Sequence, residues 1–334
     1  RPDLFAIPGG DVGFAAGVEF RRETQKDDRD PHVDGTINFT DSVTGTAYTG
    51  DLIGTSPSPD TKGARTVSSA YLEFAVPVIS PDMNIPFAQS VELQLAGRFE
   101  DFSDVGSVTK PKAAFAWDII DGVRIRGSWA QGFKAPNLEQ VNATLVTRSN
   151  TRTDYIRCEQ DLRAGRITSF ANCSESFATT AHRAGNADLK PEESETWTGG
   201  LVLEPTFIPS DYGRFTFTFD YWRVKQDGIV GLFGEGDALI LDYLMRVQGS
   251  SNPNVIRAAP TADDIAAAAG TGLDPVGAVL YVNDQYQNLL PQEARGFDIG
   301  AMWRLNGTKF GDFSLSFNAA RLLKFYRQPS PAIA

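Results

Sequence analysis

Alternation of apolar and polar residues is the clearest pattern in the chain. Every second residue from 215 to 221 is aromatic, and the residues between them are threonine or aspartate. Residues 123–126 show the same pattern, with Val123 and Ile125 set against Arg124 and Arg126. A period of two residues with one apolar face is typical of a β-strand that has lipid or a protein core on one side.

This alternation predicts nine strands, with approximate bounds of 12–23, 66–76, 90–102, 109–119, 123–131, 193–204, 213–225, 294–305 and 311–323. The connections after the even-numbered strands are short. Those after the first, fifth and seventh strands are long, spanning about 24–65, 132–192 and 226–293. The connection after the third strand, about 103–108, is a short exception. Outer-membrane barrels have this asymmetry, with short periplasmic turns and long extracellular loops.

The polar faces of several predicted strands carry charges, at Glu92, Arg98, Arg124, Arg126 and Asp298. A dry protein core does not tolerate unpaired charges, whereas a water-filled lumen does. We therefore predict an all-β fold, a transmembrane antiparallel β-barrel whose long extracellular loops carry short helices. A secreted β-sandwich or β-rich carbohydrate-active protein is the alternative. It would need apolar inward faces and a catalytic carboxylate pair in a cleft.

Composition narrows the functional classes. The 334 residues include 42 acidic and 31 basic ones, a balance that argues against nucleic acid as a partner. No run of about eighteen apolar residues occurs, so no transmembrane helix is expected. The chain opens on Arg1 without an apolar signal segment, and we expect the natural protein to begin upstream.

The two cysteines, Cys158 and Cys173, lie fifteen positions apart in the polar stretch after Pro136. Such an isolated pair predicts a local disulfide in an oxidising compartment, and two unpaired thiols are the alternative. A metal site is disfavoured, because His32 and His182 form no ligand cluster with the cysteines.

Catalytic motifs are absent from the sequence. It contains no Gly-x-Ser-x-Gly elbow, no zinc-type histidine spacing and no phosphate-binding glycine loop. The adjacent carboxylates Glu192 and Glu193 would face opposite sides of a strand. Asp27, Asp28 and Asp30 beside His32 are more typical of a hydrophilic loop tip than of a cation site. The sequence therefore predicts neither an enzyme nor a bound metal or cofactor.

Two segments of the chain match a known family. Residues 128–138, SWAQGFKAPNL, resemble a segment of TonB-dependent outer-membrane receptors, with matches at Gly132, Phe133, Ala135, Pro136 and Asn137. Lys134 stands where that family usually has arginine. Residues 185–195, GNADLKPEESE, resemble the family segment that leads into the next barrel strand, with matches at Asn186, Leu189, Pro191 and Glu192.

Two further matches follow in the same order as in the family. Residues 219–225, FDYWRVK, look like one of its strands. Residues 285–288, QYQN, and 295–300, RGFDIG, look like two later segments of the family. The match in the second includes Gly296. Each match is weak by itself, but four in the right order are a strong resemblance that runs over most of the chain.

The resemblance implies a barrel of about 22 strands with an N-terminal plug domain inside it. About nine predicted strands are too few for such a barrel, and neither a plug, a TonB box nor an aromatic-ended last strand is recognised. We therefore interpret residues 1–334 as part of a receptor barrel domain, without the plug and the last strands.

The resemblance also implies an activity. Such a receptor binds a scarce bulky solute (a siderophore, cobalamin, haem or oligosaccharide) and imports it into the periplasm of a Gram-negative bacterium. The energy would come through the TonB–ExbB–ExbD complex, which contacts the plug. Lipid and lipopolysaccharide of the outer membrane would surround the barrel. A passive outer-membrane channel without a plug is the alternative within the same architecture.

The long loops contain candidate binding residues. Five arginines in the 132–192 loop could bind an anionic solute, namely Arg148, Arg152, Arg157, Arg163 and Arg166. The alternative is a solvated loop or one that contacts lipopolysaccharide phosphates. In the 226–293 loop, residues 237–247 and 261–269 predict short helices, the second with Thr261 as N-cap. Candidate membrane-interface aromatics near strand ends are Trp129, Trp197, Tyr221, Trp222 and Trp303.

Overall fold

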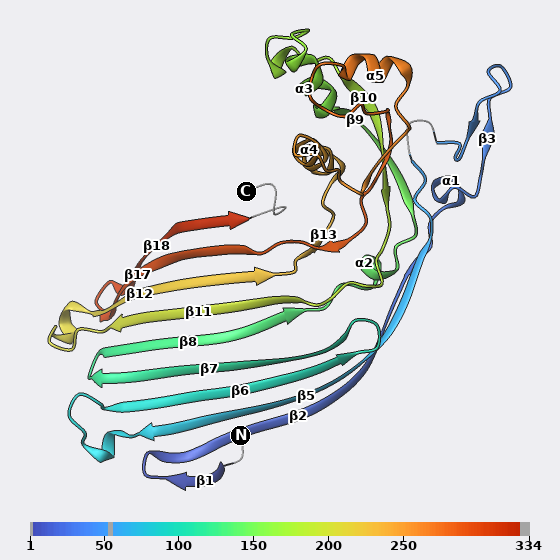
Figure 1. Cartoon of the computed structure of the whole chain (residues 1–334). Coiled ribbons are helices and arrows are strands. Elements are labelled where there is room, and N and C mark those ends of the chain that lie inside the picture. Colours follow the sequence, from blue (N-terminus) through green and yellow to red (C-terminus); the bar gives the residue numbers. More distant parts are fainter. Residues whose placement is uncertain (1–2, 53–55, 328–334) are drawn as a thin grey trace.

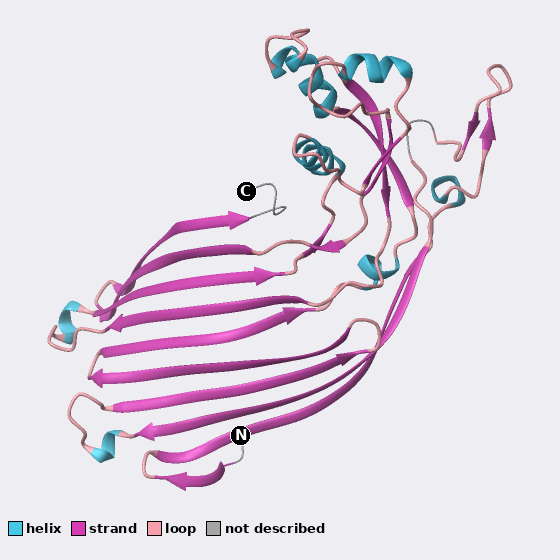
Figure 2. Ribbon diagram, in the orientation of Figure 1, coloured by secondary structure: helices cyan, strands magenta, loops and turns pink. Residues whose placement is uncertain are grey.

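A computed structural model describes residues 3–52 and 56–327, across which ten strands form one curved antiparallel sheet (Figures 1 and 2). In spatial order the strands are β1 Asp3–Ile7, β2 Gly10–Asp27, β5 Thr61–Ile79, β6 Ser90–Phe102, β7 Gly106–Ile120, β8 Val123–Lys134, β11 Glu192–Leu203, β12 Arg214–Asp227, β17 Gln292–Thr308 and β18 Gly311–Arg327. Each strand of this sheet pairs with the next strand of the sheet along the chain, and the small strands within the loops are not part of it. The result is an up-and-down barrel wall.

All nine predicted strands are present, and most are longer than the sequence indicated. The expected count of nine is nevertheless one too few, because β1 precedes them and pairs with β2. β1 has five residues, Asp3 to Ile7, which is too short for a clear alternation. The tight turn at Pro8 and Gly9 joins it to β2, at the end of the sheet where the other turns are short.

One face of the sheet is apolar and exposed. Residues paired directly across neighbouring strands point to the same face. Leu201, Phe219 and Ile299 lie on one such line across β11, β12 and β17. Phe219 is 45% exposed and Ile299 40%. An extended apolar surface of this kind needs a contact partner other than water. We call it the outer face.

The opposite face, which we call the lumen face, carries paired charges. Arg126 donates two hydrogen bonds to Asp220, at 3.0 and 2.7 Å. Arg124 does the same to Asp118, at 2.6 and 2.9 Å. These pairs bridge neighbouring or next-neighbouring strands in the middle of the sheet. Charges therefore gather on the side that a barrel would enclose, as the alternation predicts.

The two ends of the sheet differ, as the loop lengths predict. At one end the connections are short, and two of them include single 3₁₀ turns at Pro81–Met83 and Ser210–Tyr212. Gly122 in the β7–β8 turn has a φ of +77°, and a Cβ there would lie 2.0 Å from the Glu204 carbonyl oxygen. Only glycine fits this position. At the other end the chain forms the long loops.

The long loops contain more structure than the two short helices that the sequence predicts. Their helices are α1 Pro31–Asp34, α2 Leu138–Asn142, α3 Tyr155–Arg163, α4 Glu235–Arg246 and α5 Ala262–Ala268, with a 3₁₀ turn at Phe170–Asn172. Their strands are β3 Phe39–Thr40, β4 Ala47–Tyr48, β9 Val146–Thr153, β10 Ser176–Arg183, β13 Val230–Gly231, β14 Val255–Arg257, β15 Val279–Asn283 and β16 Gln287–Asn288. Among the described residues no helix has the length and apolarity needed to cross a bilayer.

Candidate functional site: the loop module and the charged lumen

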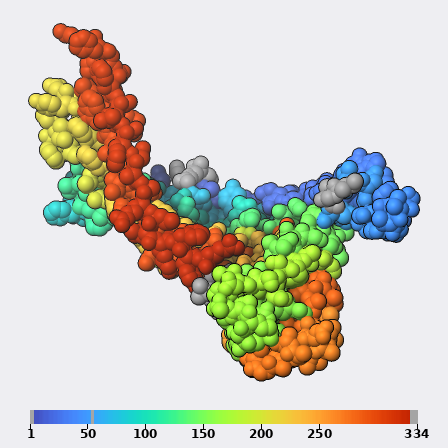
Figure 3. All heavy atoms as spheres, turned by 90° about the horizontal axis from the view of Figure 1, so that it is seen from above, coloured from blue at the N-terminus to red at the C-terminus, as the bar shows by residue number. Residues whose placement is uncertain are grey.

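The loops 132–192 and 226–293 fold together into one unit. Strands β9 and β10 of the first loop join β14 and β15 of the second in a four-stranded sheet of order β14-β15-β10-β9. The junction is the parallel pairing of β10 with β15, where Ala181 lies opposite Val282. The green and orange atoms of the two loops form one body in Figure 3. We call residues 146–183 and 230–288 the loop module.

An apolar cluster packs helix α4 against the four-stranded sheet of the module. Ala238 and Leu239 of α4 are each 2% exposed and pack with Val255 and Val282. Phe177, from the first loop, packs against the same cluster. The predicted helix 237–247 thus exists as α4, Glu235–Arg246, and its apolar side faces the module interior. The predicted N-cap is present as well, because Thr261 and Asp264 form a reciprocal capping box on α5.

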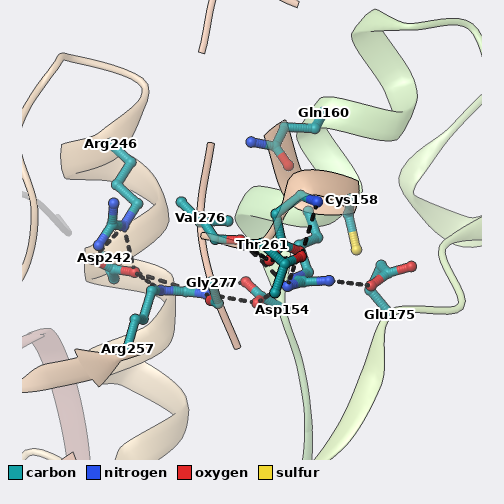
Figure 4. Close-up of polar contacts among 12 residues, drawn as sticks. Asp154, Cys158, Gln160, Glu175, Asp242, Arg246, Arg257, Thr261, Val276 and Gly277 are labelled. Atoms are coloured by element: carbon teal, nitrogen blue, oxygen red, sulfur yellow. Dashed lines mark hydrogen bonds and ion pairs between the residues drawn. The ribbon is translucent and has the colours of Figure 1, made fainter. Parts of the chain in front are cut away.

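Buried ion pairs connect the two loops (Figure 4). Arg257 of β14 binds the carboxylate of Asp154, from the first loop, at 2.7 and 2.9 Å. The same guanidinium reaches Asp242 of α4 at 3.1 Å. The side chains of Arg257 and Asp154 are 6% and 5% exposed, and that of Asp242 is fully buried. Burial disfavours the charged guanidinium, but the two carboxylates outweigh it and raise the pKa of Arg257.

Glu235 forms a second buried junction at the start of α4. Its carboxylate, 3% exposed, accepts hydrogen bonds from Arg152 at 2.7 Å, Arg183 at 3.0 Å and Asn150 at 2.6 Å. Burial opposes its ionisation. The helix-start N–H and the two arginines more than offset that cost and hold the pKa of Glu235 below its ordinary value of 4.5. Arg183 also binds the buried Asp284 at 3.1 Å.

A pH dependence follows from Glu235. Since its folded pKa lies below 4.5, its ionised form stabilises the module fully above that pH. This contribution is lost as the pH falls through the lowered folded pKa. We expect the protection factors of amide hydrogens in residues 146–183, corrected for the intrinsic exchange rate at each pH, to fall in this acidic window. Glu235→Gln should flatten the profile there, and an unchanged profile in that variant would contradict the assignment.

The structure joins Cys158 and Cys173 in a disulfide, with a Cα–Cα distance of 5.5 Å. Cys158 lies on α3 and is fully buried. Cys173 follows the 3₁₀ turn at Phe170–Asn172. The bridge therefore fastens the segment after α3 to the helix itself, inside the first loop.

Most of the predicted arginines are engaged with carboxylates of the module. Arg152 pairs with Glu235 at 2.7 Å, Arg157 with Asp264 at 2.6 Å, Arg163 with Glu159 at 2.8 Å and Arg166 with Asp161 at 2.6 Å. Arg148 differs, because no described carboxylate pairs with it. It reaches the Ser58 hydroxyl at 2.8 Å, in the 24–65 loop. Burial, Arg183 and Arg29 lower the pKa of Arg148.

The 24–65 loop forms a separate hairpin, β3–β4, beyond the loop module (Figure 1). The acidic side chains considered as a cation site form ion pairs and a helix cap. Asp27 pairs with Arg29 at 2.6 Å, and Asp28 with Lys26. Asp30 caps α1 by accepting from the His32 amide. Among the described residues, no group of three or more His, Cys, Asp or Glu is placed to hold a metal ion.

The first family-like segment lies where β8 leaves the sheet. Phe133 packs edge-on against Phe102, with ring centroids 6.3 Å apart. Pro136 is fully buried, and its carbonyl accepts from Arg65 at 2.7 Å. Asn137 caps α2 through a reciprocal capping box with Gln140. Ala135 packs on the Phe102 cluster, and a Cβ on Gly132 would lie 2.6 Å from the Ser194 hydroxyl.

The second family-like segment anchors the loops to the sheet. Asn186 donates to the Tyr286 carbonyl at 3.0 Å, across the two loops. Leu189 is 3% exposed. Glu192 accepts from the Val230 amide at 3.1 Å and from Lys134 at 3.2 Å. Pro191 lies beside this junction, at the start of β11. These residues connect the loop module to the ten-stranded sheet.

Gly296 has a different role, inside the barrel wall. It lies opposite Trp222 in the β12–β17 pairing. A Cβ on it would lie 2.8 Å from the Trp222 ring and 2.5 Å from the Arg321 carbonyl oxygen. Gly296 therefore makes room for the ring of Trp222. Trp222 is a predicted interface tryptophan, but it lies on the lumen face. Trp129 and Trp197 instead lie together on the outer face, with rings 6.0 Å apart.

A recess of about 650 Å³ lies on the lumen face near the root of the first loop. Its basic lining residues are Arg21, Arg65, Arg98, Lys110, Lys112 and Lys134, and its acidic ones are Glu73 and Glu100. All of these cations except Lys112 are paired with described carboxylates; Arg98, for example, contacts Glu100. Lys112 has no ion pair with any described residue. The lining is thus more basic than acidic, although the whole chain carries a net charge of −11.

An antiparallel wall with an apolar outer face, a charged lumen face and long loops at one end defines a β-barrel of the outer-membrane type. Residues 3–328 match the family described as TonB dependent receptor-like, beta-barrel. The chain belongs to this family, as the motif resemblance indicated.

Solved structures agree on the fold. The chain is similar to the siderophore receptor PirA from Acinetobacter baumannii, at 18% identity and a TM-score of 0.56 over 96% of this chain and 35% of that one. It is also similar to a mutant of the ferric enterobactin receptor PfeA from Pseudomonas aeruginosa in complex with enterobactin, at 15% identity, a TM-score of 0.55 and coverage of 96% and 34%. The chain thus spans about a third of the length of these receptors.

Proposed function

We propose that this chain is the barrel part of an active-transport receptor in the bacterial outer membrane. The receptor binds a bulky, scarce solute at the loop end and passes it to the periplasm with energy relayed by TonB. The observation that carries the proposal is the pairing of a charged, recessed lumen face with an apolar outer face. Membership of the receptor family supports the same assignment.

An anionic solute fits the charges best. The recess lining has more cations than carboxylates, and Lys112 is not neutralised by an ion pair with a described residue. Guanidinium and ammonium groups bind carboxylate and phosphate well. The two similar receptors are named for siderophores or ferric enterobactin. Within the proposed range of siderophore, cobalamin, haem or oligosaccharide, we therefore place an anionic siderophore first.

Coupling to the TonB–ExbB–ExbD complex is tested by uptake. Cells that produce the complete receptor should accumulate the solute only when TonB is intact. Candidate siderophores are supplied singly under iron starvation, and growth and cell-bound iron are measured. Uptake that persists in cells without TonB would instead support a passive channel. A receptor absent from the outer-membrane fraction would contradict both assignments.

Arg148 is the predicted binding arginine best placed to contact a ligand, because it lacks a carboxylate partner among the described residues. We expect Arg148→Gln to weaken binding of the transported anion about tenfold, as expected for loss of one charge-assisted hydrogen bond. Binding is measured by titration of the purified receptor. Arg163→Gln is the matched control, since Arg163 is paired with Glu159. Equal losses in both variants would contradict a role for Arg148 in binding.

A further inference from the structure

A line of aromatic and basic residues crosses the outer face. Directly paired positions run from Trp129 on β8 through Trp197, Arg223 and Arg295 to Lys324 on β18. Two tryptophans are therefore followed by three cations on one face of five neighbouring strands. Tryptophan, arginine and lysine are the residues that gather where a bilayer meets water.

The apolar part of the outer face begins next to this line. Two residues toward the short turns, Tyr221 lies opposite Phe297, and the line after that pairs Phe219 with Ile299. On β18 the neighbouring outward position is Arg321, opposite Phe297. The cations thus lie at the loop-side border of the apolar belt, on the side of the membrane where the loop module stands.

The cations on this line are only partly neutralised. Glu293 reaches Arg223 Nη2 at 3.3 Å and Lys324 Nζ at 3.8 Å. Neither Arg295 nor Arg321 has an ion pair with a described residue. Like charges placed directly opposite each other destabilise a strand pair, and Arg223 stands opposite Arg295. The Nε of Arg223 is shielded from solvent and has no described acceptor.

The next line toward the loops differs in charge. There Glu195, Lys225 and Glu293 occupy paired positions, and Lys225 also contacts Asp227 at 3.1 Å. Acidic and basic groups alternate on that line, which therefore carries no excess of positive charge. The excess of positive charge is therefore confined to the border with the apolar belt, where it faces the headgroup region of a surrounding bilayer.

We propose that Arg223, Arg295 and Lys324, with Arg321 beside them, bind the phosphate of an anionic outer-leaflet lipid. Phosphate oxygens accept from several guanidinium groups at once and relieve the opposition of Arg223 and Arg295. The lipid's acyl chains would cover Tyr221, Phe297 and Phe219, contacts that free phosphate cannot make. The inference rests on the proposed function, because it places the outer face in a membrane.

The test uses the complete receptor, purified in detergent, stripped of lipid and titrated with diphosphoryl lipid A. We expect Arg295→Gln to weaken binding about tenfold, the effect of losing one charge-assisted contact. Arg295→Lys should retain most of the binding, since it keeps the charge. Lys112→Gln is the matched control. Lys112 likewise lacks a described ion-pair partner but lines the lumen recess, and its replacement should leave lipid binding unchanged.

Three results would overturn the site. These are equal losses in Arg295→Gln and Lys112→Gln, equal binding of dephosphorylated lipid A, and inorganic phosphate binding as tightly as lipid A. The last would indicate a free-anion site. Heat-dependent migration in gels checks that each variant is folded. Because the titration is done in detergent, it is independent of the uptake assay, so failure of transport and failure of the lipid site are distinguished.

Discussion

Replacement of Arg257 by methionine is expected to unfold the loop module and leave the barrel wall intact. The variant would remove the cation that Asp154 and Asp242 share, although their side chains are only 5% and 0% exposed. Each carboxylate would keep one other cation, Arg157 at 3.4 Å from Asp154 and Arg246 at 2.9 Å from Asp242. Removing one partner of a buried ion pair costs about 3–5 kcal/mol. Hydrogen exchange and limited proteolysis should show opening of residues 146–183 and 230–288, while the strands of the wall stay protected.

Arg163→Met provides the control for this experiment. Arg163 lies in the first loop of the same module, but its side chain is 37% exposed and its partner Glu159 is one helical turn away. Exposed pairs of this spacing contribute about 0.3–0.5 kcal/mol. Equal protection in both variants would show that the Arg257 junction does not hold the two loops together. Adding Asp154→Asn to Arg257→Met should recover part of the lost stability.

Placing an arginine on the outer face is expected to destabilise the membrane-inserted barrel. Phe219 lies in the middle of the apolar belt, and Phe219→Arg should destabilise the inserted barrel by about 2–4 kcal/mol. Folding into lipid vesicles, followed by unfolding in denaturant, gives the difference. Thr218→Arg is the control. Thr218 is the neighbouring residue on the lumen face, opposite Gly300, where water and Asp220 surround the new charge.

The order of these two effects decides between the fold classes considered from the sequence. A barrel predicts a large cost at Phe219 and a small one at Thr218. A soluble β-sandwich with a dry interior on the polar side would reverse the order. The variants differ by one position in the chain, so differences in synthesis or export do not explain a contrast between them.

The sequence predicts the barrel wall well because strand periodicity is a local property. Each wall strand carries its own alternation, and the short turns carry glycines such as Gly122 that permit a positive φ. β1 was missed, because five residues are too few for a pattern. Helix α5 was found, because Thr261 and Asp264 are a local capping signal.

The loop module could not be predicted in the same way. Its strands β9, VTRSNTRT, and β10, SFATTAHR, are polar and lack a clear alternation. The pairing of β10 with β15 brings together Ala181 and Val282, far apart in the chain. Arg257 and Asp154 are 103 residues apart, and no spacing rule connects them. The arginine-rich loop therefore suggested a ligand surface, whereas the distant carboxylates that engage most of these arginines remained hidden.

Site-directed spin labelling along β12 tests the central claim most directly. The described residues include no free cysteine, so single cysteines can be introduced at positions 216 to 221 of the complete receptor without competing thiols there. In vesicles, labels at Phe217, Phe219 and Tyr221 should be accessible to oxygen, and labels at Thr216, Thr218 and Asp220 to a water-soluble quencher. Uniform accessibility to the aqueous quencher along the strand, or the reverse alternation, would contradict a membrane-embedded barrel wall.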